Sequence, residues 1–447
     1  MEGQQFSGRV GFILASIGSA VGLGSIWKFP YEVGENGGAA FLLFYLLGLL
    51  LVVVPLLLAE FVVGRRGRTD IIGSIAVAAR ADGRSPAWAA VGVLAVGGSF
   101  LILTYYAVIA GMTMDYALRS IVDGFRGTDA RHAQAIYDGV IGDPLRLAAW
   151  QAAFLAITVA IVARGVAGGI ETACTILMPV LALSLVALAA YAAVTGDMGR
   201  AAAFMLMPRP EALTAAAALE ALGLGFFSIG VGFGAMATYA AYAGKDVRLG
   251  AAAAAIVIGD TALSLVSGLA VFPLVFAHGL DPAAGSGLVF VTLPIAFGRL
   301  PAGDAIAAGF FLLLFIAALA TTLSLVELVV APLERRAGWR RGRAAVAVGL
   351  AAAVGGIPTV LSYNVWKDVR PVAGLDLYGL IDGVASNIVL PVAGILFALL
   401  VGRAMPAAAV ADALGWKGAA AQRLRALLRW PVPVLIALLV VGGVWLR

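Results

Sequence analysis

One carboxylate stands alone in a long apolar segment of this chain. Asp260 is the only acidic or basic residue between positions 249 and 277. A carboxylate inside a membrane span is costly, and such residues usually face a cavity and mark the path of an ion or a proton. Asp260 is therefore the first candidate for binding chemistry, and a structural acid hydrogen-bonded to neighbouring hydroxyls is the alternative.

Two glycine-rich runs are the second candidate. Residues 18–25 read GSAVGLGS, and residues 226–234 read FFSIGVGFG. A helix inside a bilayer must satisfy its own backbone groups, so breaks at such runs are costly unless the freed groups bind something. Free amides and helix N-termini attract a carboxylate, while free carbonyls coordinate a small cation. The alternative is that these glycines only allow close helix packing.

The composition places both features in a membrane protein. Of the 447 residues 62% are hydrophobic and 12% are charged, and the mean hydropathy is +1.01, far above the values of a water-soluble domain. The apolar segments predict about eleven spans that are long enough to cross a bilayer. Their expected positions are 10–36, 40–64, 87–118, 147–164, 169–195, 218–242, 249–278, 303–332, 344–362, 376–402 and 431–446.

The basic residues predict the orientation of the chain. Loops after the even-numbered spans carry 18 Lys and Arg residues, against 10 in the opposite loops and the C-terminus. Basic loops stay cytoplasmic, so we expect the N-terminus in the cytoplasm and the C-terminus outside. The sequence pI near 9.4 follows from these loops, and we expect no binding of nucleic acid.

Other classes of protein find little support. The single cysteine, Cys174, excludes an intrachain disulfide, and the two histidines, His132 and His278, stand alone in loop-like sequence. We therefore expect no metal site of the zinc type. The sequence contains no nucleophile with an adjacent base and no phosphate-binding loop, so we do not expect an enzyme.

The two glycine-rich runs fall in the first and sixth expected spans. This spacing is typical of two inverted five-helix repeats whose first helices are broken near the middle of the membrane. The predicted fold is an all-α membrane protein with one transporter domain over residues 1–447. Its parts would be repeat one at about 10–195, repeat two at about 218–402 and an extra helix at about 431–446.

These residues resemble the neurotransmitter:sodium symporter family, particularly its bacterial amino-acid transporters, over almost the whole chain. The most specific parts are residues 18–30 with Tyr31, residues 35–38 with Phe41, residues 226–234 with Tyr239, and residues 288–294. The resemblance implies a symporter in the bacterial inner membrane that imports a hydrophobic or aromatic amino acid by alternating access, coupled to one or two sodium ions. Alternatives are a proton-coupled carrier, or a sensor or channel for amino acids on the same scaffold.

The resemblance also implies a substrate site. The substrate carboxylate would bind the backbone near Leu23 and Gly24 and the hydroxyl of Tyr106. By itself, Tyr106 also needs a partner in an apolar span, with a place at the lipid interface as the alternative. Gly230 stands where relatives often carry a small hydroxyl residue, which leaves room for a larger side chain. The expected substrate-binding residues are Ser19, Ala20, Leu23, Gly24, Ile102, Tyr106, Phe227, Gly230, Phe233 and Leu325.

Two cation sites are implied in the same way. Their all-oxygen ligands suit hard cations. The first would combine the Ala20 carbonyl, the side chains of Ser25, Ser228 and Asp260, and the substrate carboxylate; the second would combine the carbonyls of Gly18, Val21 and Ala317 with the Thr321 hydroxyl.

Several positions depart from the family pattern. Ser25 stands where Asn is usual, and Ala320 where a hydroxyl or carboxylate is usual, so we expect weak or no sodium binding at the second site. Relatives tend to carry Asn at the position of Asp260 and to balance the cations with chloride, or with an acid at the position of Ser264. We therefore expect that Asp260 supplies this negative charge and that transport does not need chloride.

The resemblance implies moving parts on both sides of the site. Lys28 and Asp382 would form an outer ion pair above Phe233, although either charge could reach bulk water. Gly169 and Pro179, at the cytoplasmic start of the fifth span, resemble a family motif for local unwinding, because both residue types weaken a helix. A fixed kink is the alternative.

Three further acids lie near or within spans. Glu60 resembles a family residue that braces the unwound strands, and we expect Glu171 and Glu327 to be solvated or interfacial. Phe6 and Gly3 replace the Trp and Arg that family members usually carry before the first span. The sequence therefore supports no prediction about an inner ion pair.

Overall fold

Helices make up almost all of the computed structural model, which describes residues 5–207, 210–283, 287–372 and 374–445. In chain order they are α1 (Arg9–Ala20), α2 (Phe29–Glu35), α3 (Ala39–Gly48), α4 (Val54–Gly67), α5 (Ile71–Ala81), α6 (Ala89–Val122), α7 (Ala130–Ile141), α8 (Pro144–Val162), α9 (Thr172–Thr195), α10 (Met198–Leu206), α11 (Ala215–Ile229) and α12 (Ala235–Tyr242). They continue as α13 (Leu249–Ala277), α14 (Leu293–Gly298), α15 (Gly303–Arg335), α16 (Arg341–Gly355), α17 (Ile357–Ser362), α18 (Leu377–Val384), α19 (Leu390–Leu399), α20 (Ala407–Leu414), α21 (Gly418–Arg429) and α22 (Pro431–Trp445).

Short turns of other helix types join several of these elements. The π-helical turns are η1 (Gly24–Lys28), η2 (Leu49–Val53), η4 (Val166–Glu171), η6 (Leu288–Thr292), η7 (Ala385–Val389) and η8 (Leu400–Ala404), and the 3-10 turns are η3 (Pro86–Trp88) and η5 (Pro210–Ala212). Several turns continue one span into the next helix, as η2 does between α3 and α4. Within the described ranges the only β interaction is an isolated bridge between Val372 and Leu375.

The described helices agree with a multi-pass membrane protein. Nine of them are long and apolar enough to cross a bilayer, and ten if the bent pair Arg9–Ala20 and Gly24–Glu35 forms one span. The sequence predicted eleven. The difference lies in the sixth expected span, which is divided between α11 and the eight-residue α12, so neither piece has the length of a span by itself.

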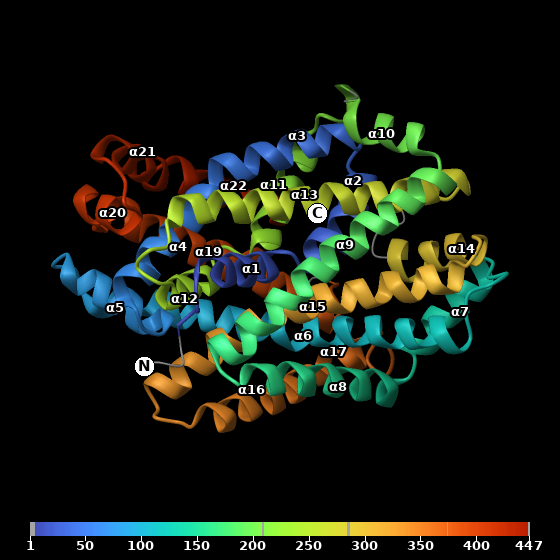
Figure 1. Ribbon diagram of the computed structural model, residues 1–447, viewed down its shortest axis with the longest axis horizontal. Helices are drawn as coiled ribbons and strands as arrows, with labels where there is room; N and C mark the ends of the chain where they lie inside the picture. Colours follow the sequence, from blue (N-terminus) through green and yellow to red (C-terminus); the bar gives the residue numbers. More distant parts are fainter. Residues whose placement is uncertain (1–4, 208–209, 284–286, 373, 446–447) are drawn as a thin grey trace.

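The first helix lies in the middle of the bundle. It packs against α9, α13 and α15 (Figure 1), while α11 packs on α3 and α12 packs on α4. All eight residues of α12 are buried. Two long helices, α6 and α15, run side by side (Figure 1). Their contact is the most extensive between any two helices of the described structure. The broken helices therefore lie among long unbroken helices. We call α6, α8, α9, α13, α15 and α16 the frame helices.

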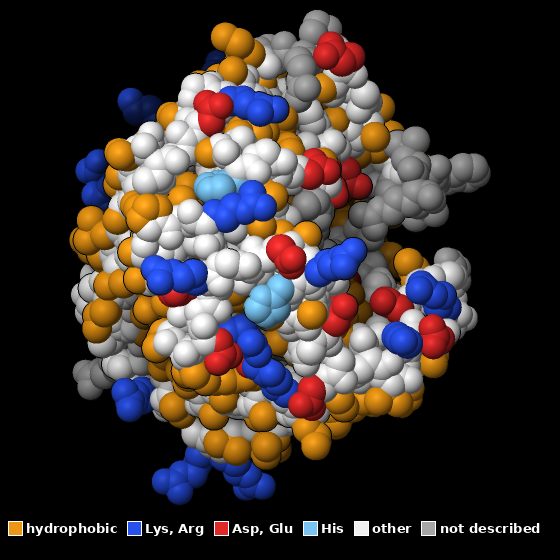
Figure 2. All heavy atoms as spheres, turned by 90° about the vertical axis from the view of Figure 1, so that its right-hand side faces the viewer, with side chains coloured by type: hydrophobic (Ala, Val, Ile, Leu, Met, Phe, Trp, Pro, Cys, Tyr) orange, Lys and Arg blue, Asp and Glu red, His pale blue; other side chains and the backbone are white. Residues whose placement is uncertain are grey.

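The surface separates charged ends from apolar flanks. Figure 2 looks onto the end of the molecule that carries α7 and α14, where charged side chains gather and hydrophobic side chains surround them. Exposed apolar residues on the flanks include Leu43, Leu50, Leu183 and Val186. Because such a surface is costly in water, this distribution suits a molecule whose sides face lipid.

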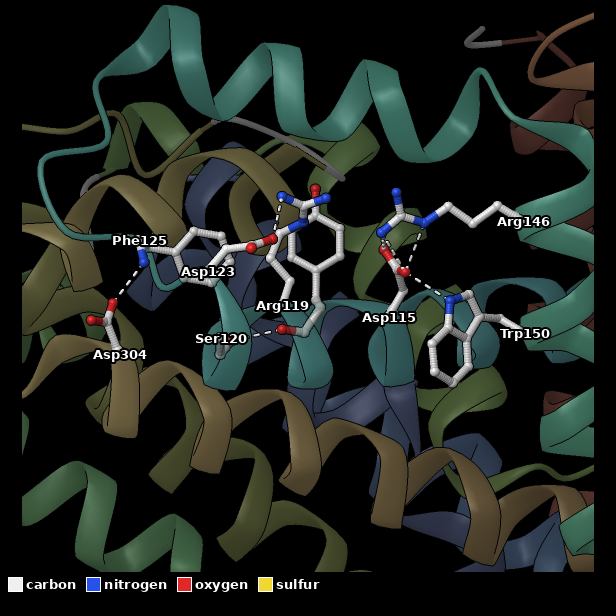
Figure 3. A network of polar contacts seen from close by, with 9 residues as sticks. Asp115, Arg119, Ser120, Asp123, Phe125, Arg146, Trp150 and Asp304 are labelled. Atoms are coloured by element: carbon white, nitrogen blue, oxygen red, sulfur yellow. Dashed lines mark hydrogen bonds and ion pairs between the residues drawn. The ribbon is translucent and has the colours of Figure 1, made fainter.

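A polar network fixes the ends of the frame helices at this charged end. The buried Asp115 of α6 accepts hydrogen bonds from Arg146 Nε and Nη2 of α8, at 2.8 and 3.0 Å, and from Trp150 Nε1 at 2.7 Å (Figure 3). Asp304 at the start of α15 accepts from the Phe125 amide at 2.6 Å. These contacts tie α6, α8 and α15 together on one side of the broken helices.

Candidate functional site

The break in the first span frees backbone groups beside a tyrosine. Helix α1 ends at Ala20, and regular hydrogen bonding resumes only at η1 from Gly24. The freed amide of Leu23 donates to the Tyr106 hydroxyl oxygen at 3.1 Å. Tyr106 is buried, so it lies inside the bundle and not at the lipid interface, which was the alternative for this side chain.

Three glycines make the break in the sixth span. Gly230, Gly232 and Gly234 have φ values of +70°, +88° and +81°, which residues with a Cβ rarely adopt. The fully buried Glu60 of α4 spans this break, because its carboxylate accepts from the amides of Gly232 at 2.6 Å and Ala237 at 3.3 Å. A buried acid thus replaces helical hydrogen bonds that the break removes.

The two breaks face each other at close range. A Cβ on Gly24 would lie 3.2 Å from the Phe227 ring and 3.3 Å from the Ser228 Cα atom. A Cβ on Gly22 would lie 2.3 Å from the Thr321 hydroxyl and 2.7 Å from the Tyr106 hydroxyl. A side chain at Gly22 would therefore displace Thr321 or Tyr106, and a side chain at Gly24 would fit only tightly between the two unwound segments.

A cavity lies where the breaks meet. Nine of the ten expected substrate-binding residues line it, and the tenth, Leu23, lines the adjoining outer cavity. The full lining is Ser19, Ala20, Gly22, Gly24, Ile102, Tyr106, Phe227, Ser228, Gly230, Phe233, Ala235, Thr321, Ser324 and Leu325. The sequence prediction missed Gly22, Ala235 and Ser324, although Ser324 follows Thr321 at helical spacing and so faces a similar direction.

Asp260 lies beside this cavity in a cluster of hydroxyls. Its fully buried carboxylate accepts from Ser25 Oγ at 2.5 Å, from Ser228 Oγ at 3.0 and 3.1 Å, and from Tyr45 Oη at 3.2 Å. In the described residues no basic side chain forms an ion pair with Asp260. The buried hydroxyl of Ser264, one turn along α13, has no hydrogen-bond partner there. The cluster can therefore coordinate a cation through one carboxylate and several neutral oxygens.

The residues of the second expected cation site come from α1, the break that follows it, and α15. The Thr321 hydroxyl donates to the Gly18 carbonyl at 3.3 Å, which links α15 to α1. The methyl group of the buried Ala320 lies 3.2 Å from where a Cβ on Gly18 would stand. Of the proposed ligands here, only Thr321 contributes a side-chain oxygen, and Ala317 and Val21 contribute carbonyls.

The expected outer ion pair is not formed in this structure. Lys28 and Asp382 line the same outer cavity. However, the Lys28 ammonium lies 3.9 Å from the Glu32 carboxylate and 5.3 Å from the centroid of the Phe227 ring, while Asp382 accepts from Ser386 Oγ at 2.8 Å. Both charges have partners on their own or neighbouring helices, so the pair is open in this conformation, and its closure stays a prediction.

The expected unwinding segment is helical here. Gly169 lies in η4, and Pro179 lies inside α9, which continues to Thr195. A Cβ on Gly169 would lie 2.1 Å from the Ile161 carbonyl oxygen, so the glycine allows the start of this span to pack against the end of α8. The structure thus has no break between the two positions.

Two acids that were expected to be solvated or interfacial are buried. Glu171 accepts hydrogen bonds from the Ser7 amide at 2.8 Å and the Ser7 hydroxyl at 2.5 Å. Glu327 is fully buried, accepts from Tyr242 Oη at 2.8 Å and forms an ion pair of 2.5 Å with Arg341 Nη2. The expectation for both acids is wrong, because their partners come from segments that are distant in the sequence.

The Glu327 network joins several helices at the cytoplasmic side of the expected topology. Arg341 at the start of α16 also donates to the Val162 carbonyl at the end of α8, at 2.8 Å. The Arg335 guanidinium lies 5.3 Å from the centroid of the Tyr242 ring, at the end of α12. One buried pair therefore connects the second half of the broken sixth span to the frame formed by α8, α15 and α16.

Comparisons with known proteins point to one family. Residues 3–134 and 130–364 match the sodium:neurotransmitter symporter family. The chain is 35% identical over 397 residues to the uncharacterized sodium-dependent transporter YhdH of Bacillus subtilis, covering 89% of this chain and 87% of that protein. It is 31% identical over 407 residues to an uncharacterized sodium-dependent transporter of Haemophilus influenzae, covering 89% of each.

A solved structure is similar over nearly the whole chain. The crystal structure of MhsT in complex with L-phenylalanine has a TM-score of 0.91 and is 38% identical in sequence. The match covers 98% of this chain and 99% of that chain.

Proposed function

The chain belongs to the sodium:neurotransmitter symporter family, and from this premise we propose that it imports a hydrophobic or aromatic amino acid together with sodium. Its relatives are transporters and not enzymes. The observation that carries the proposal is the meeting of both helix breaks at one cavity beside the unpaired carboxylate of Asp260. Such a cavity supplies partners for a zwitterion and for a cation at the same place.

The lining supports an amino acid with an apolar side chain. The carboxylate end is the region of Leu23, Gly24 and Tyr106, where the Leu23 amide and the Tyr106 hydroxyl now contact each other and a substrate carboxylate would accept from them instead. The opposite walls are apolar, with Ile102 and Leu325 among them. MhsT, which shares this fold, was crystallised with L-phenylalanine. An aromatic substrate also fits the absence of a side chain at Gly230.

In this proposal sodium binds mainly at the Asp260 cluster. The Ala20 carbonyl, Ser25, Ser228 and Asp260 surround the ion, and the substrate carboxylate completes its ligands. Because Asp260 carries the negative charge itself, chloride is not required. The second site, with Thr321 as its single side-chain ligand, binds sodium weakly.

Transport follows from rocking of the broken helices within the frame. Eleven spans in two inverted repeats, with a cytoplasmic N-terminus and an external C-terminus in a bacterial inner membrane, fit the family and the basic loops. The described conformation has the Glu327–Arg341 pair formed and the outer charges apart. Release of Tyr242 from Glu327 opens the cytoplasmic side, and pairing of Lys28 with Asp382 closes the outer side.

Counterflow in liposomes tests the proposal. Vesicles that contain the purified chain and unlabelled L-phenylalanine should take up radiolabelled L-phenylalanine, and more of it with sodium than with choline. Gly22→Ala should abolish exchange because the added methyl group meets Thr321 and Tyr106 at the cavity. The matched control is Gly97→Ala on α6, where a Cβ meets no atom within 4 Å.

Two other results of this assay would contradict the proposed function. Binding of the amino acid without exchange would contradict the carrier and favour a sensor. Exchange that ignores sodium but responds to a pH gradient would contradict sodium coupling and favour proton coupling.

A further inference from the structure

Two serines form a short hydrogen-bonded chain in the wall of the cavity. The Ser19 hydroxyl of α1 donates to Ser324 Oγ of α15 at 2.8 Å. The Ser324 hydroxyl in turn donates to the Thr321 carbonyl at 2.7 Å. Both side chains line the cavity and are 5% and 2% exposed, respectively. This series of hydrogen bonds therefore begins at Ser19, at the cavity, and ends at the Thr321 carbonyl inside the protein.

The direction of this chain decides what it offers to a ligand. A hydroxyl has one proton and two acceptor lone pairs. Both protons are used within the chain, and Ser324 Oγ accepts only from Ser19. Ser19 Oγ therefore keeps its lone pairs free at the cavity, and this part of the wall is an acceptor. Buried acceptors without a donor are costly, so a ligand that donates there gains affinity.

The other polar groups of the cavity have different tasks. Ser228 donates to Asp260, and Thr321 donates to the Gly18 carbonyl. Tyr106 belongs to the proposed carboxylate end. Ser324 directly precedes Leu325, which belongs to the apolar walls. Ser19 and Ser324 line the same cavity as the apolar Ile102 and Leu325.

We propose that the Ser19–Ser324 pair favours aromatic amino acids whose ring carries a hydrogen-bond donor, a phenol O–H or an indole N–H, over phenylalanine. This inference rests on the proposed function and narrows its substrate class. A plain phenyl ring leaves the Ser19 lone pairs without a donor. A ring with a donor satisfies them.

Competition in the counterflow assay tests the inference. The competitors are tyrosine, 4-methoxyphenylalanine, which keeps the ring oxygen but has no donor, and phenylalanine; tryptophan and 1-methyltryptophan form the second pair. In at least one of these two pairs, the wild type should bind the amino acid with the free O–H or N–H about fivefold more tightly than its methylated partner. This ratio corresponds to the net contribution of one neutral hydrogen bond. Ser324→Ala and Ser19→Ala should reduce that ratio below about twofold.

A matched control separates this effect from general damage. Ser16→Ala removes another buried hydroxyl of α1, one turn before Ser19, which does not line the cavity and has no hydrogen-bond partner in the described structure. Its ratio should equal that of the wild type. The wild-type comparison of methylated and unmethylated ligands needs no variant, so it holds even if an alanine variant does not fold.

Two results would overturn the inference while the carrier remains. The first is equal affinity of the wild type for each donor and its methylated partner. The second is an equal loss of affinity for all competitors in both serine variants, which would assign these hydroxyls to the ammonium group or to packing. Failure to exchange any amino acid would instead overturn the proposed function, and this inference with it.

Discussion

The two proposed cation sites differ in the charge of their ligands. The Asp260 cluster joins a buried carboxylate to hydroxyls from three other helical elements, η1, α11 and α3. The second site has backbone carbonyls and the single hydroxyl of Thr321, and the neighbouring Ala320 adds only a methyl group. Because a buried charge interacts strongly in a medium of low dielectric constant, we expect cation binding to be concentrated at Asp260.

The same difference bears on the need for an anion. A cation and a zwitterionic substrate in a buried cavity require a compensating negative charge. In the proposed site Asp260 supplies this charge, and the residue one turn later on α13 is the neutral Ser264. The comparison of the two sites can be broken or sharpened by changing their charge and their oxygen atoms separately.

The largest effect is expected from Asp260→Asn. The amide keeps the shape but removes the charge, so the affinity for sodium should fall about 10- to 100-fold, as for lost interactions with a charged group. Sodium titration of amino-acid uptake measures this effect. Asp115→Asn, which removes a buried acid from the network with Arg146, should leave the sodium dependence unchanged. An unaltered sodium curve for Asp260→Asn would remove that residue from the mechanism.

A smaller loss is expected from Ser228→Ala. Its hydroxyl contacts both carboxylate oxygens of Asp260, and its loss should weaken sodium binding about tenfold, the usual worth of a hydrogen bond to a charged group. The same titration applies. Ser120→Ala, which removes a buried hydroxyl that donates within α6, serves as the control. A sodium affinity within twofold of the wild type would show that the hydroxyl is not a ligand.

A gain is expected from Ala320→Ser. The new hydroxyl would add a second side-chain oxygen to the site of Thr321 and should raise the affinity for sodium about threefold, in keeping with one neutral ligand. A steeper sodium dependence of uptake would accompany it. If neither the affinity nor the steepness changed, the second site would not be limited by its missing ligand.

No effect is expected from removal of chloride. Uptake by the wild type should be equal in chloride and gluconate, because Asp260 already carries the negative charge. Asp260→Asn, tested in parallel at high sodium, provides a control that lacks this charge. Strong stimulation of the wild type by chloride would contradict the assignment.

The sequence contained the signals for the centre of the site. The glycine runs predicted both breaks, since residues with a Cβ rarely take the positive φ values found at Gly230 and Gly232. Asp260 stood out because its surroundings are apolar. Nine of the ten residues expected around the substrate line the cavity. These features could be found because each depends on residues that are close together in the chain or on the family pattern.

The periphery could not be predicted in the same way. The burial of Glu327 depends on Arg341, which is placed by the turn between α15 and α16. Glu171 is covered by Ser7 from the start of the chain. Lys28 has Glu32 and the Phe227 ring as near partners in this conformation, and Asp382 has Ser386. Such contacts depend on the conformation of loops and on the state of the transport cycle, which residue types alone do not specify.

Binding of radioactive sodium to the purified protein tests the central claim most directly. Addition of the transported amino acid should increase bound sodium in the wild type and in Thr321→Ala, and should not do so in Asp260→Asn. The reverse pattern, with the increase retained in Asp260→Asn and lost in Thr321→Ala, would contradict the account.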